Sequence, residues 1–269
     1  MNQEASSPSF FSLFIYIFGV TFALFVTVHI TSSWTVREAN ERGSRDIPWS
    51  GAYNRPLREG SGPLCDASLY TAFAAESKWK HIAYRDSIGT WLQELGFVGS
   101  GAELGVLQGQ FAQQTLSGWT SVNKYYLVDP WAHQDPEKYV DFANKGDEEQ
   151  NENMEQAILN TATYQDKVVF VRNFSTDAVK MFEDCSLDYV YVDAVHDYRG
   201  ALTDLTDWWP KIRPGGIMAG HDFIDSIDPF WGVFNVKSAV EHFSAAVAAP
   251  FWLTDDPVMP SFWIAKPCL

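Results

Sequence analysis

The chain has 269 residues, of which 46% are hydrophobic and 15% aromatic, a composition typical of a packed globular protein. Its 19 Lys and Arg stand against 34 Asp and Glu, giving a formal net charge of −15. That charge argues against a nucleic-acid surface, because phosphates are neutralised by clustered basic side chains. Three cysteines without metal-ligand spacing argue against a structural zinc site and a disulfide framework.

The first apolar segment, residues 10–30, carries no formally charged side chain over about the length that crosses a bilayer. A cleaved secretory signal is the alternative, but the stretch is longer than a usual signal core and no basic residue precedes it. We therefore expect a short tail at 1–9 and a single-pass transmembrane anchor at 10–30, with the protein in an endomembrane (ER or Golgi).

The sequence does not decide on which side of the membrane the globular domain lies. Arg37, Arg42 and Arg45 follow the span and would keep the large domain cytoplasmic under the positive-inside rule. Small enzymes with this layout nevertheless often have a luminal domain in the Golgi.

Residues 31–63 are polar with scattered Gly and Pro, which predicts a linker, and residues 64–269 follow as one globular domain. Apolar residues at helical spacing between Ala67 and Leu95 predict one or two helices that end at Gly96.

Strand and helix patterns then alternate, which predicts an α/β fold with a mostly parallel, doubly wound sheet. The expected strands are 101–106, 124–129, 167–173, 187–193 and 215–222, and the expected helices are 109–119, 134–165, 175–182 and 201–209. Ligands of such sheets bind at the carboxyl ends of the strands, so the functional residues should gather there.

The loop after the first strand lies in AELGVLQGQF, residues 102–111. Gly105 and Gly109 let the backbone turn tightly and approach a ligand, although glycines can also serve a turn alone. The dinucleotide pattern G-x-G-x-x-G is absent, because Leu107 and Gln108 stand where glycines would be needed. Asp129 ends the second strand, where a carboxylate can accept both hydroxyls of a ribose or simply terminate the strand.

These motifs resemble the class I S-adenosylmethionine-dependent methyltransferases, in the branch with E-x-G-V-x-x-G-x-F and a second strand ending in D-P-W. The resemblance runs from about Trp91 to Pro267. It is carried by AELGVLQGQFAQQTL, YYLVDPW, LDYVYVDAVHDYRGALTDLTDWWPKIRPGGIMAGHD, WGVFNVKSAVEHF and SFWIAKP. It implies a seven-stranded Rossmann-like methyltransferase sheet in the domain 64–269 and S-adenosylmethionine as the methyl donor.

The resemblance also implies residue roles. Glu103 and the backbone at Gly105 would position the methionine part of the donor, Asp129 the ribose, and Phe174 and Ser175 the adenine. The other residues expected to bind this cofactor are Leu104, Gly109, Trp131 and Asp193.

Acids and imidazoles follow the fourth and fifth strands, at Asp193, His196, His221 and Asp222. A hydroxyl acceptor must lose a proton, which a neutral imidazole or a bound divalent cation can assist. We expect His196 as the base together with Asp193, and Mg²⁺ or Mn²⁺ on Asp193, His221 and Asp222, the strand-end positions of metal-dependent O-methyltransferases. The alternative is that the acids cap helices and His221 is a rim residue.

The expected activity is O-methylation of a sugar or a small hydroxylated acceptor, with a small molecule or a glycan as partner and no nucleic acid. Phe230 and Trp231 follow the fifth strand and are candidates for the acceptor wall. Two alternatives stay open: a catalytically inactive methyltransferase-like binding protein, and a nucleotide- or NAD-binding oxidoreductase.

Overall fold

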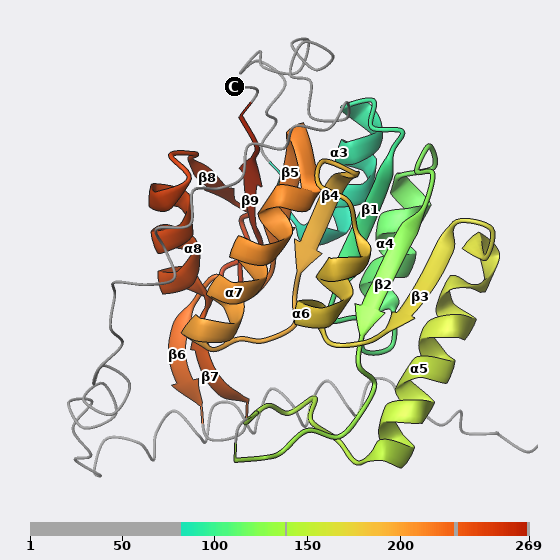
Figure 1. The fold of residues 1–269 in the computed structure, drawn as a ribbon, viewed down its shortest axis with the longest axis vertical. Coiled ribbons are helices and arrows are strands. Elements are labelled where there is room, and N and C mark those ends of the chain that lie inside the picture. The colour runs from blue at the N-terminus through green and yellow to red at the C-terminus, as the bar shows by residue number, and fades with distance from the viewer. Residues whose placement is uncertain (1–81, 138, 229–230, 268–269) are drawn as a thin grey trace, which may run out of the picture. The chain divides into compact units, whose positions relative to one another are not determined.

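The computed structural model describes residues 82–137, 139–228 and 231–267, and their fold is drawn in Figure 1. The predicted tail at 1–9, anchor at 10–30 and linker at 31–63 lie outside the described residues, as do residues 64–81 of the predicted domain.

The fold is built on a seven-stranded sheet with the strand order β3-β2-β1-β4-β5-β9-β8. The first five strands pair in parallel, and β9 runs antiparallel to both β5 and β8. This confirms the predicted mostly parallel α/β sheet. Its strands are β1 (Ser100–Leu104), β2 (Tyr125–Asp129), β3 (Val168–Arg172), β4 (Leu187–Val192), β5 (Ile212–Gly220), β8 (Phe251–Leu253) and β9 (Phe262–Ala265).

Helices cover both faces of the sheet, so the central strands are hydrophobic throughout: all six residues of β4 and all nine of β5 are buried. One apolar cluster joins the sheet to α6 (Ser175–Ala178), α7 (Tyr198–Trp208) and α8 (Val236–Ala246), which lie in front of it in Figure 1. A second cluster joins it to the opposite layer of α3 (Ile88–Glu94), α4 (Gln110–Gly118) and α5 (Asp147–Thr161). The short 3-10 helices are η5 (Arg85–Ser87), η6 (Ala162–Tyr164), η7 (Val179–Met181) and η8 (Trp209–Lys211).

The segments that follow the carboxyl ends of the parallel strands determine where the site lies. The parallel strands point their carboxyl ends downward in Figure 1, toward the segment that joins β2 to α5 and toward the hairpin of β6 (Asp225–Asp228) and β7 (Gly232–Asn235). A bridge between Asp141 and Gly232 holds these two segments together. Gly232 has φ 104°, and a Cβ there would lie 2.2 Å from the carbonyl oxygen of Val140, so the contact requires glycine.

The helix predicted over 134–165 is wrong in its first part, because α5 begins only at Asp147. The preceding segment is held by polar side chains that bond to the backbone. The Asp141 carboxylate accepts from the Ala143 N–H, and the Asn144 amide donates to the carbonyls of Gln134 and Tyr139. Such bonds compete with helical ones, and Pro136 also interrupts the helical ladder.

Two further expectations are corrected. Within the described ranges no helix is long and apolar enough to cross a membrane: the longest, α5, has 15 residues against about 20 needed. This finding contradicts the predicted endomembrane localisation, while the span expected at 10–30 itself lies outside the described residues. Cys185 is buried and disulfide-bonded, although the cysteine pattern argued against disulfides.

Candidate active site

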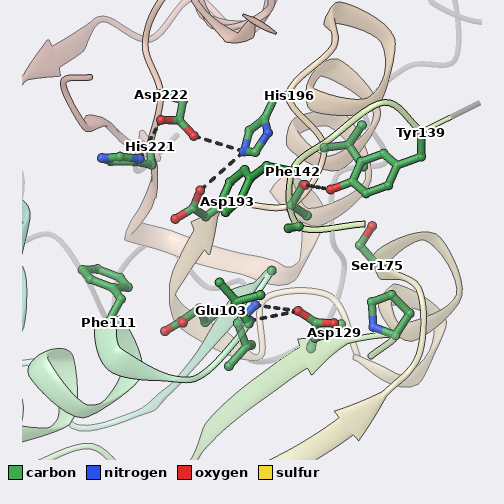
Figure 2. A pocket seen from close by; sticks show the side chains of 18 of the residues that line it. Glu103, Phe111, Asp129, Tyr139, Phe142, Ser175, Asp193, His196, His221 and Asp222 are labelled. Atoms are coloured by element: carbon green, nitrogen blue, oxygen red, sulfur yellow. Dashed lines mark hydrogen bonds and ion pairs between the residues drawn. The ribbon is translucent and has the colours of Figure 1, made fainter. Parts of the chain in front are cut away.

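A cavity of about 440 Å³ opens at the carboxyl ends of the parallel strands (Figure 2). Its walls come from the segments that follow β1, β2, β3, β4 and β5, together with Arg85 from η5. Glu103 and Asp129 lie on one side of it in Figure 2, and Asp193, His196, His221 and Asp222 lie together on the other. The sheet thus brings together the residues that the sequence spreads over about 120 positions.

Gly105 brings the backbone after β1 close to the end of β4. It has φ 80°, and a Cβ at this position would lie 1.9 Å from the carbonyl oxygen of Asp193. The turn out of β1 can therefore pass beside the end of β4 only with glycine at 105. Gly105 and Asp193, at the ends of these two adjacent strands, both line the cavity.

Asp129 holds the loop after β1 in place. Its Oδ2 accepts from the N–H groups of Val106 and Leu107 at 2.9 and 3.1 Å, and its Oδ1 accepts from the Trp131 N–H at 2.7 Å. A carboxylate offers about four acceptor positions, so three are occupied and roughly one is left for a ligand. Burial raises the pKa of Asp129, against the opposing effect of these backbone hydrogen bonds.

Three residues expected to bind the cofactor do not line the cavity. Trp131 is fully buried and its indole N–H donates to the Leu107 carbonyl at 2.8 Å, so it supports the loop from behind. Leu104 belongs to the hydrophobic core beside the sheet. Gly109 is the N-cap of α4 and packs against Ala157 of α5. The other expected residues, Glu103, Gly105, Asp129, Phe174, Ser175 and Asp193, all line the cavity.

Glu103 is a buried acid at the cavity wall. Its side chain accepts a hydrogen bond from the Tyr125 hydroxyl at 3.1 Å, and its residue exposure is 1%. Burial raises the pKa of Glu103 to about 8, against the lowering effects of Tyr125 and of the nearby positive charge of Arg85. A cationic ligand group beside Glu103 would relieve this cost of burying the carboxylate.

The acidic side of the cavity is organised around His196. Its Nδ1 lies 2.7 Å from Oδ2 of Asp141, its Nε2 lies 3.0 Å from Oδ2 of Asp222 and 3.7 Å from Oδ1 of Asp193, and its ring stacks on Phe234. Nε2 makes no hydrogen bond of good geometry to either of the latter carboxylates within the described residues. It is a buried polar atom directed into the cluster.

Three carboxylates change the protonation of this imidazole. Burial opposes the charged form, but Asp141, Asp193 and Asp222 outweigh it and raise the pKa of His196 well above its usual 6.5. The three carboxylates therefore favour the protonated form of His196 in the protein alone. His196 can accept a proton from an acceptor only when positive charge nearby offsets the carboxylates.

The set of atoms that could hold a cation differs from the expected one. Asp193, His196 and Asp222 each offer a ligand atom within 4.8 Å of the others. His221, which was expected in this set, instead places Nδ1 2.8 Å from Oδ1 of Asp222, at the edge of the cluster. Two carboxylates and one imidazole suit Mg²⁺ or Mn²⁺.

Aromatic rings surround the mouth of the cavity. Phe142 and Trp231 meet edge to face with centroids 4.5 Å apart, which joins the β2–α5 segment to the β6–β7 hairpin. Tyr139 donates its hydroxyl to the carbonyl of Ala194 at 3.0 Å and so closes the wall after β4 (Figure 2). Trp231 was expected at an acceptor wall; Phe230 lies outside the described residues.

Two charged residues at the site were missed by the sequence analysis. Asp141 lies in the segment for which the sequence predicts a helix, and its contact with His196 spans 55 positions. Arg85 precedes the first strand, and its guanidinium donates to Oδ2 of Asp193 at 3.2 Å. The turn-forming residues Pro136 and Gly146 could have indicated a loop around Asp141, whereas no local pattern marks Arg85.

A family model described as a methyltransferase domain matches residues 102–223. No curated protein gives a significant match.

Three solved structures show how far the structural similarity extends. An O-methyltransferase from Bacillus cereus in complex with SAH is 15% identical, with a TM-score of 0.44, over 74% of this chain and 89% of that chain. A putative O-methyltransferase from Nostoc punctiforme is 13% identical, with a TM-score of 0.47, over 68% and 55%. The N-methyltransferase NodS from Bradyrhizobium japonicum is 14% identical, with a TM-score of 0.46, over 73% and 98%. At these identities the similarities carry no information on the acceptor.

Proposed function

We propose that this chain, which belongs through residues 102–223 to the S-adenosylmethionine-dependent methyltransferases, transfers a methyl group to a hydroxyl of a sugar or small hydroxylated acceptor. One observation carries the proposal. A single cavity has the Gly105 loop with Glu103 and Asp129 on one side, and the cluster of His196 with its carboxylates on the other. The first side suits a donor that bears a nucleoside and an ammonium group, and the second suits an acceptor that must lose a proton.

The donor side follows from the loop geometry. Asp129 has roughly one acceptor position left, which supports one hydrogen bond from a ribose hydroxyl rather than the two first expected. Phe174 is 45% exposed at the rim and Ser175 lies beside it, so a planar base has an aromatic face and a hydroxyl to contact. Methyl transfer from a sulfonium is an in-line displacement, so this side acts chiefly by orientation.

The acceptor side of the cavity would remove the proton from the acceptor hydroxyl. His196 is oriented by Asp141 at Nδ1, which leaves Nε2 as the atom that accepts the hydroxyl proton. Asp193 and Asp222 lie next to Nε2 and would hold a divalent cation through their carboxylates alone, because the lone pair of Nε2 is needed for the proton. When bound, such a cation lowers the pKa of an acceptor hydroxyl and offsets the carboxylates that otherwise keep His196 protonated.

The aromatic mouth supports a hydroxylated ring as acceptor. Phe142 and Trp231, whose ring centroids lie 4.5 Å apart, line the same cavity as the cluster, and Phe234 stacks on His196. Aromatic faces stack well on the apolar face of a sugar or on another ring.

The proposal is tested by incubating the purified protein with labelled S-adenosylmethionine, Mg²⁺ or Mn²⁺ and a cell extract, and then identifying the labelled product. We expect the label in a methyl ether of a small molecule or glycan. The Asp193→Ala variant should give no labelled product. Donor binding without transfer to any acceptor would favour an inactive binding protein. Calorimetric binding of NAD instead of S-adenosylmethionine would favour an oxidoreductase.

The same assay separates the two roles near His196. Activity that survives excess EDTA would remove the cation from the mechanism, and the sulfonium of the donor would then be the positive charge that allows His196 to act as the base. Loss of activity in EDTA that Mn²⁺ or Mg²⁺ restores would support the cation.

A further inference from the structure

A row of side-chain amides connects the loop after β1 to the segment before α5. The NH2 group of Gln108 donates to Oδ1 of Asn153 at 2.9 Å, and the NH2 group of Asn153 donates to Oε1 of Gln150 at 3.4 Å. The NH2 group of Gln150 donates to the backbone carbonyl of Ala143 at 2.8 Å. Asn153 and Gln150 are buried, with exposures of 5% and 7%, so their amides depend on these partners. We call Gln108, Asn153 and Gln150 the amide relay.

The hydrogen bonds continue from the amide relay to the imidazole of His196. The N–H of Ala143 donates to Oδ1 of Asp141 at 2.7 Å, and Oδ2 of Asp141 lies 2.7 Å from Nδ1 of His196. One oxygen of Asp141 is therefore held by Ala143 while the other contacts the imidazole. The place of Ala143 thus determines how Asp141 meets His196.

The carbonyl at the end fixes the orientation of every amide in the relay. A backbone carbonyl only accepts, so the group of Gln150 that faces Ala143 must be its NH2. Oε1 of Gln150 then faces Asn153, which must donate to it and offers its own Oδ1 to Gln108. Turning over any one amide would place two oxygens or two NH2 groups against each other. The relay therefore has one arrangement, and removing a single amide interrupts it.

The relay joins the two sides of the cavity. Gln108 belongs to the donor loop (residues 105–110), and its neighbour Leu107 is held by Asp129. Gln150 and Ala143 line the cavity at the other end of the relay. Asn153 and Gln150 lie three positions apart and so share one face of α5. Asn153 is not part of the cavity wall, so it can act only through its neighbours.

We propose that the amide relay is a positioning device, in which Asn153 and Gln150 hold Asp141 in place relative to the donor loop. Asp141 in turn directs Nε2 of His196 toward the acceptor, so the inference rests on the proposed function. In-line methyl transfer requires that the sulfonium, the acceptor oxygen and the base keep a fixed mutual geometry. A relay that links the donor loop to the base provides this geometry from within the protein.

Two variants interrupt the relay at different points. Asn153→Leu has a similar volume and removes both of its hydrogen bonds, and Gln150→Met keeps the length of the side chain but removes the donor to Ala143. Gln156→Met is the matched control. Gln156 lies on the same helix and loses a hydrogen bond of the same kind, to Asn160, which does not lead to Asp141. Circular dichroism of each variant checks the fold.

Proton NMR of the purified full chain tests the positioning without any acceptor. The Nδ1 proton of His196, bonded to a buried carboxylate, should give a downfield signal that exchanges slowly with water, and Asp141→Asn identifies this signal by altering it. Exchange should be roughly 2-fold to 30-fold faster in Asn153→Leu and in Gln150→Met, the range for coupling transmitted through a contact network. The Gln156→Met protein should exchange like the wild type.

A double-variant cycle tests whether the effect on activity travels through Asp141. Methyl transfer from saturating labelled S-adenosylmethionine into the cell extract should fall roughly 2-fold to 30-fold in Asn153→Leu, while calorimetry shows a nearly unchanged donor Kd. In the Asp141→Asn background, Asn153→Leu should add little further loss. Two independent effects would multiply instead.

The outcomes separate this inference from the proposed function. Unchanged exchange of the His196 proton in both relay variants overturns the inference and leaves the proposed function intact. Losses that multiply in the double variant also overturn it, because the relay would then not act through Asp141. A wild type that transfers no methyl group to any acceptor overturns the proposed function, and the role given to the relay with it.

Discussion

Oδ2 of Asp141 lies 2.7 Å from Nδ1 of His196, and this contact connects the β2–α5 segment to the residue that follows β4, 55 positions later. Asp141 is almost completely buried, with a side-chain exposure of 3%. A carboxylate at Nδ1 holds the proton on that nitrogen and directs Nε2 into the cavity. The segment before α5 therefore completes the acceptor side of the site.

Asp141→Asn should lower kcat by roughly 10-fold to 1000-fold, the span usual for loss of positioned proton transfer, while donor affinity changes little. The amide can still contact Nδ1, but it does not stabilise the imidazolium that forms when the proton is taken. Single-turnover methyl transfer and calorimetry with S-adenosylmethionine measure the two effects separately. Glu137→Gln, an exposed change in the same segment, serves as the control. Equal kcat in Asp141→Asn and wild type would exclude this role.

Asp129→Ala should weaken donor binding by roughly 10-fold to 100-fold, because it removes both a ligand acceptor and the anchor of the loop. The N–H groups of Val106 and Leu107 would lose their partner. Hydrogen exchange at these two amides should therefore accelerate even without ligand, and calorimetry should report the lost affinity. Unchanged exchange combined with lost affinity would mean that Asp129 acts on the ligand alone.

The two ends of the cavity should respond to different substitutions. Trp231→Ala should raise the KM for the acceptor roughly 10-fold and leave the donor Kd unchanged, since its ring contacts Phe142 at the mouth. Phe174→Ala should do the reverse, since Phe174 lies at the rim beside Ser175. Steady-state kinetics with each substrate varied in turn measures both. If both variants changed the same parameter, the division into a donor end and an acceptor end would be wrong.

The sheet and the donor loop could be predicted because their signals are local. Alternating strand and helix patterns located the five parallel strands to within a few residues, and Gly105 with Asp129 marked the ends of the first two. Parallel strands end at one edge, so residues after each strand had to meet. The same reasoning predicted that Asp193 and His196 lie at this edge, and both line the cavity.

The rest depended on contacts that no local pattern encodes. Asp141 reaches His196 through a segment whose Asx-type bonds replace the helix predicted from its composition. Trp131 was expected to bind the cofactor from the resemblance, but its ring is fully buried and its N–H donates to the carbonyl of Leu107. His196 places Nε2 3.0 Å from Oδ2 of Asp222, whereas His221 places Nδ1 2.8 Å from Oδ1 of the same carboxylate, and no local sequence pattern distinguishes these two positions.

Asp204 is a buried acid outside the cavity that shapes the pH dependence of stability. Its Oδ1 accepts from the Ser175 hydroxyl at 2.6 Å, and its Oδ2 has no hydrogen-bond partner in the part of the chain that the structure describes. Burial raises the pKa of Asp204 to about 7, and Asp207 and Asp197 add to this against the effect of Ser175. The unfolded chain would lose this proton near the ordinary value of 3.8.

The folded state thus binds the proton of Asp204 more tightly than the unfolded state. Stability falls as the pH rises from about 4 to about 7, by on the order of 4 kcal/mol at most, since one pKa unit corresponds to about 1.4 kcal/mol. Asp204→Asn keeps an acceptor for Ser175 and carries no charge, so it should gain stability over wild type at pH 8 and gain little at pH 4. Urea unfolding of both proteins across this range measures the difference, and Asp166→Asn at an exposed site is the control. Parallel stability curves for wild type and Asp204→Asn would show that this carboxyl ionises at its ordinary pH and that Ser175 or solvent satisfies it.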